Sequence, residues 1–200
     1  MIFLYDIKGR VFRMENQAIQ MAQRYLRRFD QILGVMAYKM LSARPIDNIT
    51  LYFIKCMVPH HQAAIYMCEN LLQYSPYKPL EKIAQNIIIK QTEGIEQMRE
   101  IARTTRGFKN TKMEVMNYTK QYLLITNNML ERMKNSPRSV NINLSFVGEM
   151  IPHHEGAIGM CHNLLQYRID PRLQRVAESI IQEQSKGVEE LKAVREILCK

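Results

Sequence analysis

Apolar residues recur at spacings of three and four along most of this chain, which is the period of a helix that buries one face. In the first such stretch Tyr25, Phe29 and Met36 fall on one side. The pattern predicts a first helix from about residue 15 to about residue 42, after a short tail over residues 1–13. Further stretches of the same kind predict helices over about 50–74, 80–102 and 111–135, followed by two more that end near residue 198.

The helical pattern occurs twice in the chain. The segment FIKCMVPHHQAAIYMCENLLQY aligns without a gap with FVGEMIPHHEGAIGMCHNLLQY, so that His60 falls on His153. The same alignment continues on both sides and defines two similar halves, over about 15–103 and about 111–198, joined by TTRGFKN. A unit of three helices has little core of its own. We therefore expect both halves to pack around a pseudo-twofold axis into one all-α domain over residues 14–200.

The second helix of each half has polar chemistry on the face that is expected to point inward. At 100° per residue one arc of roughly 120° holds Met57, His60, His61, Ala64, Met67, Cys68 and Leu71. The second half repeats it with Met150, His153, His154, Ala157, Met160, Cys161 and Leu164. The opposite side of the first copy is expected to hold Lys55, Gln62, Tyr66, Glu69, Asn70 and Gln73, and His162 is expected at the surface. Cys56 and Cys199 have no cysteine partner in the repeat and are interpreted as incidental.

The third helix of each half carries one amide in the middle of its apolar face, Gln91 or Gln184. A buried amide without a partner costs about 1 to 3 kcal/mol, so the inward histidines are its expected partners. Gly94 and Gly187 lie inside these helices and suggest that two helices cross closely there.

A proline precedes each histidine pair, at Pro59 and Pro152. Two structures are compatible with it. Either the helix runs through the proline and bends beside the histidines, or the helix begins at the proline, which is a favoured first position.

Imidazole, thioether and thiolate groups together favour a soft metal ion, with copper(I) as the first choice and zinc as the second. No inward carboxylate is apparent, which disfavours a carboxylate-bridged di-iron centre. We predict metal buffering or detoxification, with Gln91 and Gln184 fixing the imidazole tautomers. The predicted ligands are His60, His61, His153 and His154, supported by Met57 and Met150 and by Cys68 and Cys161.

Three alternatives remain open. The histidines and glutamines can satisfy one another as a buried polar core of a structural or interaction protein. A metal-dependent oxidoreductase would need an open coordination position. Acid–base catalysis is disfavoured, because no inward Asp or Glu orients an imidazole and no nucleophilic serine lies in the motif. An enzyme is therefore the less favoured class.

Composition and charge narrow the class further. The values of 46% hydrophobic and 24% charged residues are typical of a globular protein. The net charge of +9 comes from scattered Lys and Arg without a basic strip interleaved with aromatics, so no nucleic-acid partner is expected. No apolar run approaches the roughly 20 residues of a membrane span. Four cysteines without a recognisable signal peptide favour the cytoplasm.

The histidine segments resemble a bacterial family known as domain of unknown function 305. The motif F-x-x-x-M-[IV]-P-H-H-x-x-A-I-x-M is found at Phe53–Met67 and Phe146–Met160, and a weaker I-I-x-x-Q segment begins at Ile87 and is echoed from Ile180. The resemblance implies a ferritin-like bundle of duplicated helix pairs with a functional histidine pair, and copper binding through Met and His in some members. The chain departs from this pattern at Gly94 and Gly187, where members usually carry an acidic residue, and it shows no export signal, which many members have.

Overall fold

The computed structural model describes residues 2–107 and 109–200, and it describes side chains from residue 15 onward. This part of the chain is helical, without any strand, which confirms the all-α prediction. The helices are α1 (Ile2–Leu41), α2 (Ile49–Leu72), α3 (Lys78–Thr104), α4 (Lys112–Lys134), α5 (Ile142–Leu164) and α6 (Pro171–Leu198).

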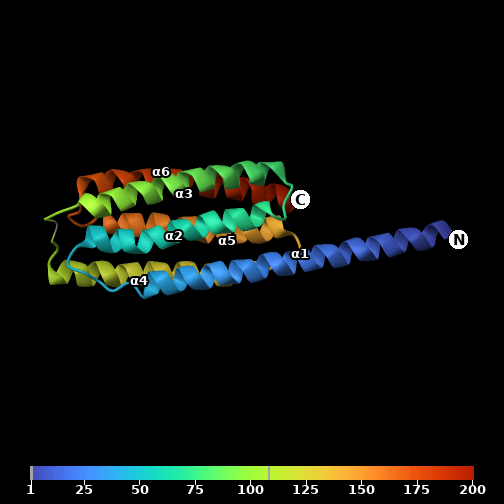
Figure 1. Ribbon diagram of the computed structural model, residues 1–200, viewed down its shortest axis with the longest axis horizontal. Coiled ribbons are helices and arrows are strands. Elements are labelled where there is room, and N and C mark those ends of the chain that lie inside the picture. The colour runs from blue at the N-terminus through green and yellow to red at the C-terminus, as the bar shows by residue number, and fades with distance from the viewer. Residues whose placement is uncertain (1, 108) are drawn as a thin grey trace.

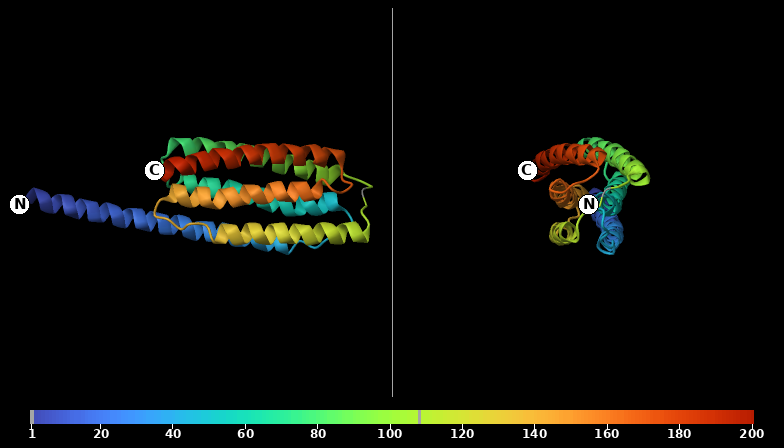
Figure 2. Two further views of the ribbon diagram at one scale, coloured as in Figure 1. Left: turned by 180° about the vertical axis from the view of Figure 1, so that it is seen from behind. Right: turned by 90° about the vertical axis from the view of Figure 1, so that its left-hand side faces the viewer.

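The helices form three layers of two (Figure 1). Helices α2 and α5 make the middle layer, α3 and α6 cover one side of it, and α1 and α4 cover the other, as the end-on view of Figure 2 shows. Successive helices run antiparallel, and each layer pairs one helix with its equivalent from the other half. The predicted pseudo-twofold relation between the halves thus corresponds to the observed arrangement, with α2 and α5 meeting at its centre.

The ends of the helices follow from local side chains. The Asn48 side chain accepts a hydrogen bond from the Leu51 N–H at the start of α2, and Asn141 caps α5 in a similar way. Thr111 and Glu114 form a reciprocal capping box at the start of α4. Because α2 is capped at Asn48, it runs through Pro59, and α5 runs through Pro152 in the same way, so the alternative in which the helix begins at the proline is wrong. The bend beside the histidines stays a prediction.

Helix α1 begins at Ile2, so the predicted tail over residues 1–13 is helical from its second residue. The N-terminal part of α1 extends past the ends of the other helices (Figure 1). The side chains of this extension lie outside the described part of the structure.

The join between the halves is held by Asn110. Its backbone N–H donates to the Asp47 carbonyl at 2.8 Å, and its side-chain oxygen accepts from the Ile49 N–H at 3.0 Å. Its side-chain amide donates to the Arg168 carbonyl at 3.0 Å. One buried residue therefore ties the loop before α2 to the loop before α6.

The expectation that Asn70 lies on an outer face is wrong. Its side chain is buried and donates to the Tyr25 carbonyl at 3.0 Å, and Asn163 donates to the Tyr118 carbonyl in the other half. The physical reason is the layering. A helix in the middle layer is covered on two sides, so a residue opposite the central axis can still be buried against α1 or α4.

Candidate functional site

Two histidines meet at the centre of the bundle, where α2 and α5 cross the pseudo-twofold axis. The rings of His60 and His153, called here the axial histidines, stack with centroids 3.7 Å apart. The Nε2 of His60 lies 3.2 Å from the His153 carbonyl oxygen, and the Nε2 of His153 lies 3.1 Å from the His60 carbonyl oxygen. Each half therefore provides both a ring and a carbonyl acceptor for the other.

This contact fixes the protonation of both rings. A carbonyl oxygen only accepts hydrogen bonds, so each Nε2 must carry the proton and each Nδ1 carries the lone pair. Burial lowers the pKa of His153 to about 4, and burial followed by the neighbouring histidines lowers the pKa of His60 well below its usual value. Both rings are thus neutral at physiological pH, and the Nδ1 of each is buried without a hydrogen-bond partner.

The second histidine of each pair points toward the outer layer of α3 and α6. The rings of His61 and His154, called here the seam histidines, lie against Gly94 of α3 and Gly187 of α6. A Cβ built on Gly94 would lie 3.0 Å from the His61 Cδ2, and one built on Gly187 would lie 2.8 Å from the His154 Cδ2. The sequence predicted a close approach at the two glycines. In the structure, the groups that approach there are an imidazole ring of the middle layer and a helix backbone of the outer layer.

The seam histidines also border two surface cavities between α3 and α6. His61 lines a cavity of about 70 Å³, and His154 lines a smaller one of about 30 Å³. Each is large enough for at least one water molecule. Gln91 and Gln184 line both cavities, and their side-chain oxygens are buried without a hydrogen-bond partner. The predicted proximity of the amides to the histidines is observed, but no hydrogen bond joins them in the described residues.

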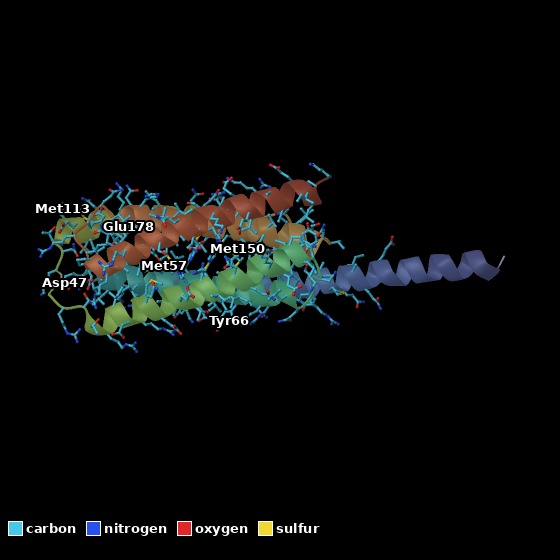
Figure 3. All side chains as sticks on the ribbon, turned by 90° about the horizontal axis from the view of Figure 1, so that it is seen from above. Asp47, Met57, Tyr66, Met113, Met150 and Glu178 are labelled. Carbon is cyan, nitrogen blue, oxygen red and sulfur yellow. The ribbon has the colours of Figure 1, made fainter. Side chains whose placement is uncertain are left out.

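The predicted sulfur ligands are all buried in the same two helices. Met57 and Met150 are fully buried, and Figure 3 places them beneath the α3–α6 layer near the middle of the bundle. Cys68 and Cys161 are fully buried free thiols, and burial raises the pKa of each, so that both are protonated at neutral pH. In the part of the chain that the structure describes, no group of three or more His, Cys, Asp or Glu side chains is arranged to hold a metal ion.

A buried carboxyl group was missed by the sequence reasoning. Glu149 is fully buried one turn before His153, and its Oε2 accepts a hydrogen bond from the Tyr25 hydroxyl at 2.5 Å. Burial raises its pKa to about 8, against the effects of the Tyr25 hydrogen bond and of Arg138. The group is therefore largely protonated at neutral pH.

The alignment of the two halves contains a signal that could have predicted this buried carboxyl group. Glu149 falls on Cys56 when the halves are aligned, and it is the polar member of an otherwise apolar pair. Cys56 is itself buried close to Tyr122, and burial raises its pKa to about 11. The two halves thus differ at one core position that faces a tyrosine in each.

Comparisons with known proteins bear on the fold. The family described as Domain of unknown function (DUF305) matches residues 14–102 and 50–195. A solved structure described as a DUF305 fragment from Deinococcus radiodurans is similar with a TM-score of 0.53 and 20% sequence identity. That similarity covers 76% of this chain and 99% of the other. No protein with a curated description matches the chain.

None of the helices in the described residues is both long enough and apolar enough to cross a membrane.

Proposed function

Because the chain belongs to the DUF305 family, whose description names no activity, we propose its function from the site itself: binding of a soft metal ion, copper(I) first and zinc second. The ion is cargo that the protein buffers or detoxifies. The primary ligands are the axial and seam histidines, and the fully buried thioethers of Met57 and Met150 support them.

One observation carries this proposal. The Nδ1 atoms of all four histidines are buried without a hydrogen-bond partner. A buried acceptor left unpaired costs about 1 to 3 kcal/mol, so each of these atoms would gain from a binding partner. A soft metal ion is such a partner, because a neutral imidazole nitrogen with a free lone pair is a metal ligand. The described side chains do not already form a group of three or more ligands, so the proposed binding requires some of them to move.

The second ring nitrogen of the axial histidines supports the same conclusion. Metal-bound histidines usually donate their other N–H to a carboxylate or a backbone carbonyl, which fixes the tautomer. The Nε2 atoms of His60 and His153 make such bonds, each to a carbonyl of the opposite half. The protein would not have to change either tautomer when the metal binds.

The choice of copper(I) over harder ions rests on the remaining donors. Thioether sulfur selects copper(I), whereas magnesium and calcium require oxygen ligands. The thiols of Cys68 and Cys161 are reserve ligands, since each would have to lose a proton on binding. Free buried thiols are also compatible with a cytoplasmic location, which we propose for the protein.

The test is the metal content of protein purified from copper- and zinc-supplemented cells, measured by elemental analysis. A variant in which His60, His61, His153 and His154 are replaced by leucine should lose the metal. The matched control is His162→Leu, because His162 is the exposed fifth histidine of the chain. Near-stoichiometric metal in the wild type and control but not in the quadruple variant is the expected result.

A competition experiment covers the case in which the quadruple variant does not fold. The metal-free wild-type protein is titrated against a colorimetric copper(I) chelator. Failure of the wild type to withdraw copper(I) from the chelator, together with metal-free protein from supplemented cells, would refute the proposal.

The stacked axial pair favours a second candidate, a purely structural polar core. In that case the reciprocal hydrogen bonds alone account for His60 and His153. The free energy of unfolding of the folded wild type would then be independent of added copper(I). A metal-binding protein is instead stabilised by its ion, by about 2.7 kcal/mol at a free concentration of about 100 times Kd.

A further inference from the structure

We infer that the cleft between α3 and α6 is the route by which the metal ion reaches the buried histidines, with the seam histidines at its inner end. This inference rests on the proposed function and adds the path to the site. The α3–α6 seam, defined by Gln91, Gly94, Gln184 and Gly187, is then a functional surface of the molecule.

The burial of the histidines makes a specific route necessary. The axial histidines are fully buried, and both of their rings lie between α2 and α5. The cavities described at the surface include two that a histidine borders, and both lie between α3 and α6. An ion that enters there meets His61 or His154 before it can meet either axial ring.

Two glycines lie at the inner end of this route, in the lining of the two cavities. Gly94 and Gly187 bring the helix backbones close to the seam histidines, and neither leaves room for a side chain. A methyl group at Gly187 would lie 2.9 Å from the His154 Nε2, and one at Gly94 would lie 3.1 Å from the His61 Nε2. Each glycine costs its helix about 1 kcal/mol relative to alanine, so their presence in both halves has a steric reason.

The walls of the seam suit a passing cation. The side-chain oxygens of Gln91 and Gln184 are more than nine-tenths buried, unpartnered, and part of the lining of both cavities. Glu93 and Glu183 line the larger cavity, where the Lys90 ammonium is paired with Glu93 at 3.1 Å, so that Glu183 adds the unpaired negative charge. In the smaller cavity Lys186 is paired with Glu190 at 3.8 Å. The amide oxygens of the two glutamines and the carboxylates nearer the surface attract a cation. They are hard oxygen ligands, so a soft ion passes on to the histidines.

The first test needs no metal. Metal-free protein is treated with diethyl pyrocarbonate, which acylates accessible neutral imidazole nitrogens, and each histidine is followed by mass spectrometry. We expect His162 to react first, the seam histidines next and the axial histidines last. Equal protection of seam and axial histidines would overturn the route.

The second test measures transfer rates with silver(I), used as an oxygen-stable probe for copper(I). In the Gly94→Ala/Gly187→Ala variant, whose added methyl groups crowd the rings of the seam histidines, uptake and release of silver(I) should both be slower. The acylation of His61 and His154 should decrease in parallel. The matched control is Gly34→Ala, where an added Cβ meets no atom within 4 Å. Unchanged rates in the folded double variant would overturn the route.

A second variant keeps the test decisive if the alanine variant does not fold. Glu93→Gln with Glu183→Gln changes only exposed positions and should lower the association rate of silver(I), most strongly at low salt. An association rate equal to that of the wild type would also overturn the route. If the wild type takes up no silver(I) or copper(I) while the acylation order is as expected, the proposed function fails and the accessible seam remains.

Discussion

The buried carboxyl of Glu149 makes the stability of the metal-free protein depend on pH in an unusual direction. A carboxylic acid in an unfolded chain loses its proton near pH 4.5, whereas burial raises the pKa of Glu149 in the folded protein to about 8. Between these two values unfolding releases a proton, so raising the pH favours unfolding. The stability associated with Glu149 is therefore fully present below about pH 4.5 and is lost as the pH rises to about 8.

The size of the effect follows from the difference between the two pKa values. Each unit of difference is worth about 1.4 kcal/mol, so Glu149 lowers the free energy of unfolding by on the order of 5 kcal/mol between pH 4.5 and pH 8. Since a domain is typically stable by about 5 to 15 kcal/mol, a change of this size is easy to measure.

The perturbation is Glu149→Gln, which resembles the protonated acid in shape and still accepts from Tyr25. The free energy of unfolding is measured by urea titration at pH 5, 7 and 9, with chelator present. The variant should match the wild type within about 1 kcal/mol at pH 5 and exceed it by several kcal/mol at pH 9. The control is Glu69→Gln, because Glu69 is exposed on α2 in the first half of the chain.

A difference between Glu149→Gln and wild type that is constant with pH would refute the reasoning. A second variant checks the cause. The Tyr25 hydrogen bond lowers the pKa of Glu149, so in Tyr25→Phe the loss of stability should still begin near pH 4.5 but should continue to a higher pH and become larger. If the upper end of the pH range stays the same, the Tyr25 hydroxyl does not bond to the Glu149 carboxyl in solution.

Three further predictions concern other parts of the bundle. Burial lowers the pKa of His61 to about 3 and of His153 to about 4, so the metal-free protein should lose thermal stability as the pH falls from about 6.5 to 4, and equal melting temperatures at pH 7 and pH 4 would contradict this. Gly156→Ala should destabilise the fold by about 1 to 3 kcal/mol in urea, because its Cβ would overlap a methionine of α4, whereas Gly34→Ala in open space should be neutral or stabilising. Asn110→Ala should lower the free energy of unfolding by about 1 to 3 kcal/mol through the loss of its side-chain bonds, and an unchanged urea midpoint would show that the join is not held this way.

The packing of two similar halves around an axis was within reach of the sequence because the chain repeats itself. The three layers and the contact between the rings of His60 and His153 were not predicted, and they come from the structure. The inward direction of the histidine face also follows from helical period alone. The family membership expected from the same segments is confirmed by the match over most of the chain.

What the sequence did not predict depends on which neighbours cover a helix. Asn70 was expected outside because one apolar face was assumed for α2, but a middle-layer helix has two covered sides. Glu149 was not predicted to be buried because a carboxylate is normally exposed to solvent. The structure buries it in the middle-layer helix α5 and places the Tyr25 hydroxyl of α1 beside it, and this burial keeps the acid neutral. Residues 2–13 are helical in the structure, but their sequence has no apolar periodicity strong enough to distinguish a helix from an irregular tail. The metal ligands and the ferritin-like comparison remain predictions.

The contact between the axial histidines has the form of an interface between two identical subunits. The ring of one half bonds to the carbonyl of the equivalent residue in the other half, and the reverse bond is also present, as in a twofold symmetric homodimer. A half of this chain would therefore be expected to recover its missing contacts by pairing with a second copy of itself. In this chain the two halves are joined covalently through the loop that contains Asn110, so their sequences can differ. Cys56 and Glu149, which occupy equivalent positions with different chemistry, are a divergence that a true homodimer could not contain.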